Sequence, residues 1–320
     1  MQPGSNQVAP PHAGACLLTG GSGMIGQALA GALEAGGQVV VQAVRGSRPG
    51  GNPRRSIPWD PQAATAFADP AALEGLDAVV HLSGANVAAH RWTEAYKREI
   101  LTSRTESTLA LARTLATLRP PPAVLLSASA TGFYGDRGNE VLNEASMPGG
   151  DFLAQTCRAW EAATAVAEAA GIRVIHLRLG VVLSARGGAL GKVLPLFRAG
   201  LGGRLGSGRQ WMSWIAIDDA VGAIVHLLGL GPAGAGSPRG AVNCVAPYLV
   251  TNAEYTGALA QVLHRPAVLP APAFALRLAL GEMADVAVLS SCRALPEALV
   301  QSGFCFRFPR IGPALEHLLG

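Results

Sequence analysis

The residues whose types and spacing most clearly indicate chemistry are three glycines, Gly20, Gly23 and Gly26. They follow the apolar run 15–19 and precede a stretch with helical spacing, which places them in a turn between a strand and a helix. In such a turn the first glycine permits a tight bend, the second lets the backbone approach a pyrophosphate, and the third lets the helix pack closely on the strand. The pattern predicts a dinucleotide-binding turn. Its expected contact residues are Gly20, Gly21, Ser22, Gly23, Met24 and Ile25.

A cation follows the second predicted strand. Arg45 lies nineteen residues after Gly26, at the place where a site of this kind recognises the ribose of the adenosine. An acid there would hold a bare 2′-hydroxyl, whereas an arginine suits a 2′-phosphate. Arg45, with Val44 beside it, therefore predicts NADP(H) in preference to NAD(H). Two alternatives stay open: Arg48 shares or takes over this role, or Arg45 is an ordinary surface arginine.

Alternating strands and helices must position this turn. Apolar runs predict strands over residues 15–19, 38–44, 78–82, 123–127 and 173–179. Helical spacing predicts helices over residues 26–35, 94–118, 152–170 and 217–228. Apolar strands of this type are buried on both faces of a parallel sheet. The predicted fold class is therefore α/β, a doubly wound Rossmann sheet with a smaller C-terminal α+β lobe.

Three parts make up the predicted domain organisation. Residues 1–14 are rich in Pro and Gly and are expected to form a flexible tail. Residues 15–240 are expected to form an NADP-binding Rossmann domain. From residue 229 onward Gly and Pro divide the chain into short pieces, so residues 241–320 are expected to form a substrate lobe, whose first part could add a strand to the main sheet.

Composition excludes several classes of protein. Apolar residues make up 49% of the 320 and charged residues 14%, which is too apolar and too weakly charged for a disordered chain. No apolar run approaches the roughly 20 residues that a membrane-spanning helix needs. The net charge of +4 comes from scattered arginines that form no basic stripe, so we expect neither a nucleic acid nor a membrane as a partner.

Cysteine and histidine usage indicates neither a disulfide framework nor a metal site. The five cysteines are odd in number, far apart and never in a CxxC pair, and the seven histidines form no evident metal set. The N-terminal residues have no basic segment followed by an apolar one, as a signal peptide would. We therefore expect a protein of the reducing cytoplasm.

Further motifs accompany the glycine turn along most of the chain. They are Leu-Thr-Gly-Gly-Ser-Gly-Met-Ile-Gly (18–26), His-Leu-Ser-Gly-Ala-Asn (81–86), Ser-Ala-Ser-Ala-Thr-Gly-Phe-Tyr-Gly (127–135), Leu-Arg-Leu-Gly-Val-Val-Leu (177–183) and Gly-Ser-Gly-Arg-Gln-Trp-Met-Ser-Trp-Ile (206–215). With these motifs, residues 16–319 resemble the atypical extended short-chain dehydrogenase/reductase superfamily. The resemblance is to its epimerase-like branch, the NAD-dependent epimerase/dehydratase family with a short extra C-terminal domain.

The resemblance implies further contacts with the cofactor and with a substrate. The implied cofactor contacts are Leu82, Ser83, Gly84, Glu99, Arg104, Ser127, Gly180 and Val181. The expected substrate contacts are Arg178, Arg209, Gln210, Trp211 and Trp214, in a region where extended relatives hold a nucleotide sugar. The two tryptophans would supply stacking surface.

The superfamily's redox chemistry uses a Tyr as acid and base, a Lys four residues later, and a Ser or Thr on the preceding strand end. This chain has two lysines, Lys97 and Lys192, and the residues four positions before them are Thr93 and Gly188. The Tyr-x-x-x-Lys pair is therefore missing from the sequence. By alignment, a cysteine takes the place of the Tyr and a glutamate takes the place of the Lys.

Four side chains are candidates for acid–base chemistry. They are Ser129, Tyr134, Cys157 and Glu161. Ser127 is a close alternative to Ser129. Each candidate also has a structural interpretation: a serine at a strand end often bonds its own backbone, Cys157 could be a small core residue, and Glu161 could pair with Arg158 or Arg178.

Two function classes follow from these observations. One is an NADP(H)-binding oxidoreductase or epimerase-like enzyme that acts on an unknown small molecule. The other is a catalytically silent NADP(H)-binding protein that senses redox state or regulates a partner. A nucleotide-sugar epimerase proper is the weakest interpretation, because it needs the missing Tyr and Lys. The chain is expected to be a monomer or a homodimer that pairs through helices 94–118 and 152–170.

Overall fold

The computed structural model describes residues 14–46, 55–63, 66–229 and 238–320. The predicted tail, apart from Gly14, lies outside the described residues, and so does Arg48. Among the described helices, none is long and apolar enough to cross a membrane.

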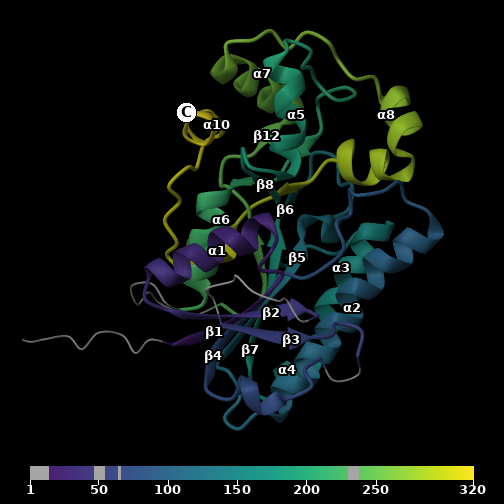
Figure 1. Ribbon diagram of the computed structural model, residues 1–320. Helices are drawn as coiled ribbons and strands as arrows, with labels where there is room; N and C mark the ends of the chain where they lie inside the picture. The colour runs from purple at the N-terminus through teal and green to yellow at the C-terminus, as the bar shows by residue number, and fades with distance from the viewer. Residues whose placement is uncertain (1–13, 47–54, 64–65, 230–237) are drawn as a thin grey trace, which may run out of the picture.

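A seven-stranded sheet forms the centre of the molecule (Figure 1). Its strands are β1 (Ala15–Thr19), β2 (Val39–Arg45), β3 (Arg55–Trp59), β4 (Leu76–His81), β5 (Val124–Ala130), β7 (Arg173–Leu179) and β11 (Gly240–Cys244). They lie in the order β3-β2-β1-β4-β5-β7-β11, and every neighbouring pair is parallel. This is the strand order of a doubly wound Rossmann sheet with one strand added, which confirms the predicted fold class.

Helices cover both faces of the sheet (Figure 1). Helices α1 (Met24–Ala35) and α6 (Ile217–Leu227) pack on one face. Helices α2 (Glu94–Thr117), α3 (Phe152–Ala162) and α4 (Ala165–Ala169) pack on the other. Successive side chains of β1 alternate between the two layers: Cys16 and Leu18 belong to the α1 and α6 core, whereas Leu17 belongs to the α2 core. Both faces are therefore apolar, as predicted for buried parallel strands.

The remaining elements build the second lobe and its connections. The strands are β6 (Val141–Leu142), β8 (Val181–Leu183), β9 (Trp211–Met212), β10 (Trp214–Ala216), β12 (Val250–Thr251) and β13 (Arg293–Ala294). The helices are α5 (Gly188–Arg198), α7 (Asn252–Leu263), α8 (Ala273–Leu280), α9 (Glu297–Gln301) and α10 (Ile311–Leu319). Three shorter helical segments are η1 (Pro70–Leu73), η2 (Thr131–Tyr134) and η3 (Ala284–Val288).

The C-terminal part of the chain is joined to the first part at several places. Strand β11 pairs with β7 at the edge of the main sheet, as the sequence predicted for this segment. Strand β12 pairs with β9, and β13 pairs with β6. Helices α5, α7 and α10 surround the fully buried Trp214. The domain boundary at residue 240 stays a prediction.

Two elements differ from the predictions. Strand β3 was not predicted, because Pro58 and two polar residues interrupt its apolar pattern; it is an edge strand, where proline is tolerated. The helix predicted over residues 152–170 is divided into α3 and α4 at Ala163 and Thr164. The Thr164 hydroxyl donates to the Glu161 carbonyl oxygen (2.8 Å), a local bond that competes with regular helix geometry.

Candidate functional site

The glycine turn has the geometry that its spacing predicted. Gly20 has a φ of +69°, and a Cβ atom on it would lie 2.7 Å from the backbone carbon of Leu82. A Cβ atom on Gly26 would lie 2.3 Å from the carbonyl oxygen of Gly20, so only glycine allows helix α1 to pack this closely on the turn. The Gly23 N–H donates to the Gly20 carbonyl oxygen (3.0 Å) and closes the bend.

The N-terminus of α1 is suited to an anion. Its N-cap residue, Gly23, offers no side-chain hydrogen bond, and the first turn of the helix carries no acidic residue. The first N–H groups of a helix have no partner within the helix, and they carry the positive end of its dipole. A phosphate at this position would satisfy both. The residues present therefore fit the diphosphate of a dinucleotide.

A cavity of about 2400 Å³ opens beside this turn, along the carboxyl ends of the strands near β1 and β4. The predicted cofactor contacts that line it are Gly20, Gly21, Ser22, Met24, Val44, Arg45, Ser83, Gly84 and Glu99. The remaining predicted contacts, which are not among its lining residues, are Gly23, Ile25, Leu82, Arg104, Ser127, Gly180 and Val181. The structure thus places the turn, the exposed Arg45 and the end of β4 around one space.

Arg104 lies beneath the cavity wall and does not line it. Its guanidinium donates to the carbonyl oxygens of Ile100 (2.9 Å) and Ala85 (3.0 Å), and it lies 5.0 Å from the centre of the Trp160 ring. The Ser103 hydroxyl accepts from the Ala85 N–H (3.0 Å). Through these bonds to Ala85, helix α2 holds the loop after β4 in place.

Several lining residues escaped the sequence predictions. They include Gln42, Trp59, Asp60, Tyr96, Ser184, Arg186, Asp218 and His317. Gln42 carried a signal, since it is a polar residue within an otherwise apolar strand. His317 gave none, because it lies on the C-terminal helix α10, far from the turn in sequence.

A row of polar side chains crosses the sheet beneath the α2 and α3 layer. Register pairs Thr19 with His81, His81 with Ser127, and Ser127 with His176. His81 bonds Thr19 Oγ1 through Nδ1 (2.7 Å) and Thr108 Oγ1 through Nε2 (2.9 Å). The Ser127 hydroxyl is buried and has no hydrogen-bond partner among the described residues. Ser127 is thus a cofactor candidate that the structure places in the interior, one row below the strand ends.

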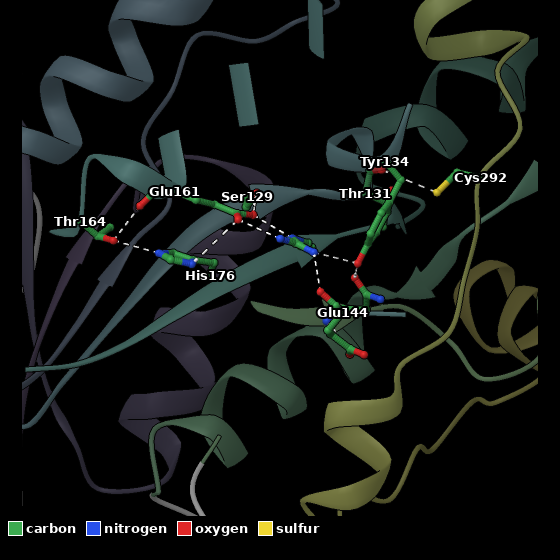
Figure 2. A network of polar contacts seen from close by, with 10 residues as sticks. Ser129, Thr131, Tyr134, Glu144, Glu161, Thr164, His176 and Cys292 are labelled. Carbon is green, nitrogen blue, oxygen red and sulfur yellow. Dashed lines mark hydrogen bonds and ion pairs between the residues drawn. The ribbon is translucent and has the colours of Figure 1, made fainter. Parts of the chain in front are cut away.

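Three of the four catalytic candidates, Ser129, Tyr134 and Glu161, meet in a second polar network, one row closer to the strand ends (Figure 2). Glu161 is its centre: Oε1 accepts from the Ser129 hydroxyl (2.7 Å) and from Arg178 Nε (2.9 Å), and Oε2 accepts from Arg178 Nη2 (2.9 Å). This bidentate ion pair is largely buried, with 5% and 11% of the two side chains exposed. Of the two arginines considered as partners for Glu161, the structure shows Arg178.

Tyr134 continues the network toward the C-terminal part. Its hydroxyl donates to Asn243 Oδ1 (2.7 Å) and accepts from Arg178 Nη1 (3.0 Å). The guanidinium carbon of Arg178 lies 3.4 Å from the centre of the Phe133 ring. Both hydrogen-bonding positions of the Tyr134 hydroxyl are therefore in use, and the side chain has no exposed surface.

Burial decides the protonation of these candidates. It raises the pKa of Tyr134 to about 12, an effect that the neighbouring Arg178 opposes. Burial and the negative charge of Glu161 raise the pKa of the Cys157 thiol to about 11. The negative charge of Glu161 thus disfavours the thiolate of its neighbour Cys157. Neither Tyr134 nor Cys157 is ionised near pH 7 in this arrangement.

A smaller cavity of about 530 Å³ adjoins Glu161 on the other side of the network. Its lining residues are Phe133, Pro148, Gln155, Arg158, Ala159, Glu161 and Ala162. Of the four catalytic candidates, Glu161 lines this smaller cavity, and none of the four lines the larger one.

The predicted substrate contacts are dispersed. Arg178 is held in the buried network, and Arg209 is exposed. The buried Gln210 amide donates to the Leu205 carbonyl oxygen (3.0 Å). Trp214 is fully buried, so it offers no stacking surface. Trp211 is half-buried beneath the guanidinium of Arg293, which lies 4.2 Å from its ring centre.

In the part of the chain that the structure describes, no group of three or more His, Cys, Asp and Glu side chains could hold a metal ion.

Comparison with known proteins gives the family. Residues 16–239 match the family described as "NAD dependent epimerase/dehydratase family". The chain belongs to this family. A second family, the domain of unknown function DUF1731, matches residues 271–318, so the predicted short C-terminal domain is also confirmed. The family binds NAD(P).

Several known members of the family are similar to this chain over nearly its whole length. Epimerase family protein Mb2239 of Mycobacterium bovis is 42% identical over 94% of this chain and 96% of its own. Epimerase family protein SDR39U1 of Homo sapiens is 34% identical over 95% of this chain and 99% of its own. The crystal structure of human SDR39U1 (isoform 2) with NADPH matches with a TM-score of 0.85 and 32% identity, over 95% of this chain and 98% of that one.

Proposed function

We propose that this chain binds NADP(H) in the larger cavity and is an NADP(H)-dependent oxidoreductase or epimerase-type enzyme acting on an unknown small molecule. The observation that carries the proposal is the uncapped N-terminus of α1, which faces a cavity that also holds the exposed Arg45. In this proposal the turn residues hold the diphosphate, and Arg45 holds the 2′-phosphate of the adenosine ribose. The NADPH that human SDR39U1 carries in its crystal structure supports the choice of cofactor.

The bound nicotinamide would supply hydride chemistry, while this chain would supply binding, orientation and proton handling. Cofactor contacts from Ser83, Gly84 and Glu99 belong to the proposal because these residues line the cavity. The Ser129 hydroxyl is directed to Glu161, so this pair could pass a proton only after a change in the network. Acid–base chemistry would therefore differ from that of a Tyr and Lys pair.

A second candidate function is a catalytically silent NADP(H)-binding protein that senses redox state or regulates a partner. The closed network favours it, because Ser129, Tyr134, Glu161 and Arg178 are bonded to one another and none of them lines the larger cavity. Trp160 is also buried, and its indole donates to Thr108 Oγ1 (2.9 Å). Turnover of any substrate separates the two candidates.

Arg45→Asp tests the cofactor assignment. We expect it to weaken NADPH binding by about 10- to 100-fold and to leave NADH nearly unchanged, because a charge-assisted hydrogen bond to the 2′-phosphate is lost. Calorimetric titration of wild type and variant with both nucleotides measures this. Arg198→Asp is the matched control, since Arg198 is an exposed arginine on α5 that does not line the cavity. An unchanged preference for NADPH in Arg45→Asp would refute the assignment.

Ser129→Ala and Tyr134→Phe test the enzymatic proposal. A stopped assay of NADPH oxidation against a panel of carbonyl compounds comes first, and any turnover then serves as the readout. We expect each variant to lower kcat by about 10- to 100-fold if its hydroxyl takes part in proton transfer. If both variants turn over substrate as fast as wild type does, neither hydroxyl takes part in the mechanism. Tight NADPH binding with no turnover on any compound would favour the silent protein.

Our proposal for the cellular context is a monomer or homodimer in the cytoplasm, with neither nucleic acid nor membrane as a partner. Helix α2 and the segment 152–170, which contains α3 and α4, would form the dimer interface.

A further inference from the structure

A short turn between β8 and α5 presents one arginine to the cofactor cavity. The Ser184 hydroxyl accepts from the Arg186 N–H (3.2 Å), and the Ser184 carbonyl oxygen accepts from the Gly187 N–H (3.4 Å). Ser184 is buried, whereas Arg186 is exposed. The turn is therefore fixed at its base, and the Arg186 side chain extends from its tip.

This turn lies against the start of helix α1. A Cβ atom on Gly188 would lie 3.3 Å from the terminal methyl carbon of Met24, and one on Gly187 would lie 3.6 Å from the Met24 sulfur. Met24 is the first residue of α1 and follows the glycine turn directly. Ser184, Ala185 and Arg186 line the same cavity as Gly20, Gly21 and Ser22. Two segments more than 150 residues apart in sequence thus meet where the diphosphate is expected.

The charge of Arg186 is uncompensated within the described part of the chain. No described carboxylate forms an ion pair with it. Asp218 lines the same cavity, but it pairs with His317 Nε2 (3.3 Å) and lies 4.0 Å from Arg307 Nη1. A guanidinium offers a planar fork of donors that matches two phosphate oxygens. Together with the uncapped helix N-terminus, Arg186 provides what a doubly charged anion needs.

We propose that Arg186 binds the diphosphate of the dinucleotide from the side opposite the glycine turn. The inference rests on the proposed NADP(H) site and adds a residue to it. Arg186 and Arg45 then have separate roles: Arg186 recognises the diphosphate that NADPH and NADH share, and Arg45 recognises the 2′-phosphate that only NADPH carries. A phosphate group of the substrate is the other source of the same chemistry, and the experiment distinguishes the two.

The test compares three probes on wild type, Arg186→Met, Arg45→Met and the control Arg198→Met, an exposed arginine on α5 that does not line the cavity. The probes are NADPH, NADH and adenosine 2′-monophosphate, which carries the 2′-phosphate and no phosphate at the 5′ position. For Arg186→Met we expect about 10- to 100-fold weaker binding of NADPH and NADH and unchanged binding of the monophosphate. For Arg45→Met we expect weaker binding of NADPH and of the monophosphate, and unchanged NADH.

Several outcomes would overturn the inference. Wild-type affinity for both dinucleotides in Arg186→Met would exclude a contact with the diphosphate. If the NADPH-loaded Arg186→Met protein then also bound inorganic pyrophosphate more weakly than loaded wild type, the anion would belong to a substrate and not to the cofactor. Wild-type protein that binds none of the three probes would instead refute the proposed function itself. Arg186→Lys keeps the positive charge but lacks the planar guanidinium, so it should retain part of the affinity for both dinucleotides. This partial affinity would show that the turn still folds when residue 186 is changed.

Discussion

At the scale of single residues, the buried ion pair between Glu161 and Arg178 makes a prediction about stability. Removing one partner of a buried ion pair leaves the other charge without compensation, at a cost of about 3 kcal/mol. We therefore expect Glu161→Gln to lower the free energy of unfolding by about that amount in urea titrations. Replacing both residues, as in Glu161→Gln with Arg178→Met, should cost less than the sum of the single changes.

The matched control is Glu168→Gln, an exposed glutamate on the neighbouring helix α4, which should leave stability within about 0.5 kcal/mol of wild type. Equal stability of Glu161→Gln and wild type would mean that the pair contributes nothing to the fold, and that the network is free to rearrange for catalysis.

Cys157 allows a second prediction at this scale. Its thiol is buried and its pKa is raised to about 11, so the reactive thiolate is scarce at pH 8. Iodoacetamide should label the exposed Cys305 and leave Cys157 intact in the native protein, as peptide mass mapping can show. Cys305→Ser should then remove most of the label. If Cys157 were labelled as fast as Cys305, its thiol would not be buried as described and would be available for acid–base chemistry.

At the scale of elements, His81 of β4 links β1 to α2 and makes stability depend on pH. Burial lowers its pKa from 6.5 to about 4. Below pH 6.5 the unfolded chain takes up a proton at this position and the folded chain does not, so the contribution of His81 to stability falls as the pH falls. Between pH 7 and pH 5 the loss is about 2 kcal/mol.

Urea unfolding at the two pH values measures this effect. Other groups titrate in the same range, so the comparison that counts is between wild type and His81→Gln. We expect the variant to be less stable than wild type at pH 7 but to lose about 2 kcal/mol less on going to pH 5. The same loss in both proteins would show that His81 accepts a proton in the folded state.

The elements that the sequence predicted well are those with local signals. Strand β1, the glycine turn and the start of α1 follow from apolar periodicity and glycine spacing, which act within a few residues. Strand β3 lacked that signal because Pro58 interrupts it. The sequence offered Arg178 as one partner for Glu161, which the structure shows. The bonds from Tyr134 to Arg178 and to Asn243 could not be predicted, since these residues come from distant segments that only the fold brings together.

At the scale of the whole molecule, the C-terminal part of the chain and the first part share strand pairs. Strands β12 and β13 of the C-terminal part pair with β9 and β6 of the first part. Asp219 at the start of α6 accepts from the backbone N–H groups of Arg307 (2.7 Å) and Phe308 (2.9 Å), which fixes the approach to α10. His317 and Leu318 of α10 then reach the larger cavity. The C-terminal part is therefore placed to influence what binds beside the glycine turn.

Calorimetric titration of the purified wild-type protein with NADPH and with NADH tests the central claim most directly. We predict saturable binding of one NADPH per chain, at least about tenfold tighter than NADH, because NADH cannot make the proposed contact between Arg45 and the 2′-phosphate. Absence of saturable binding by either nucleotide would contradict the claim that the turn at Gly20 and the cavity beside it form a dinucleotide site.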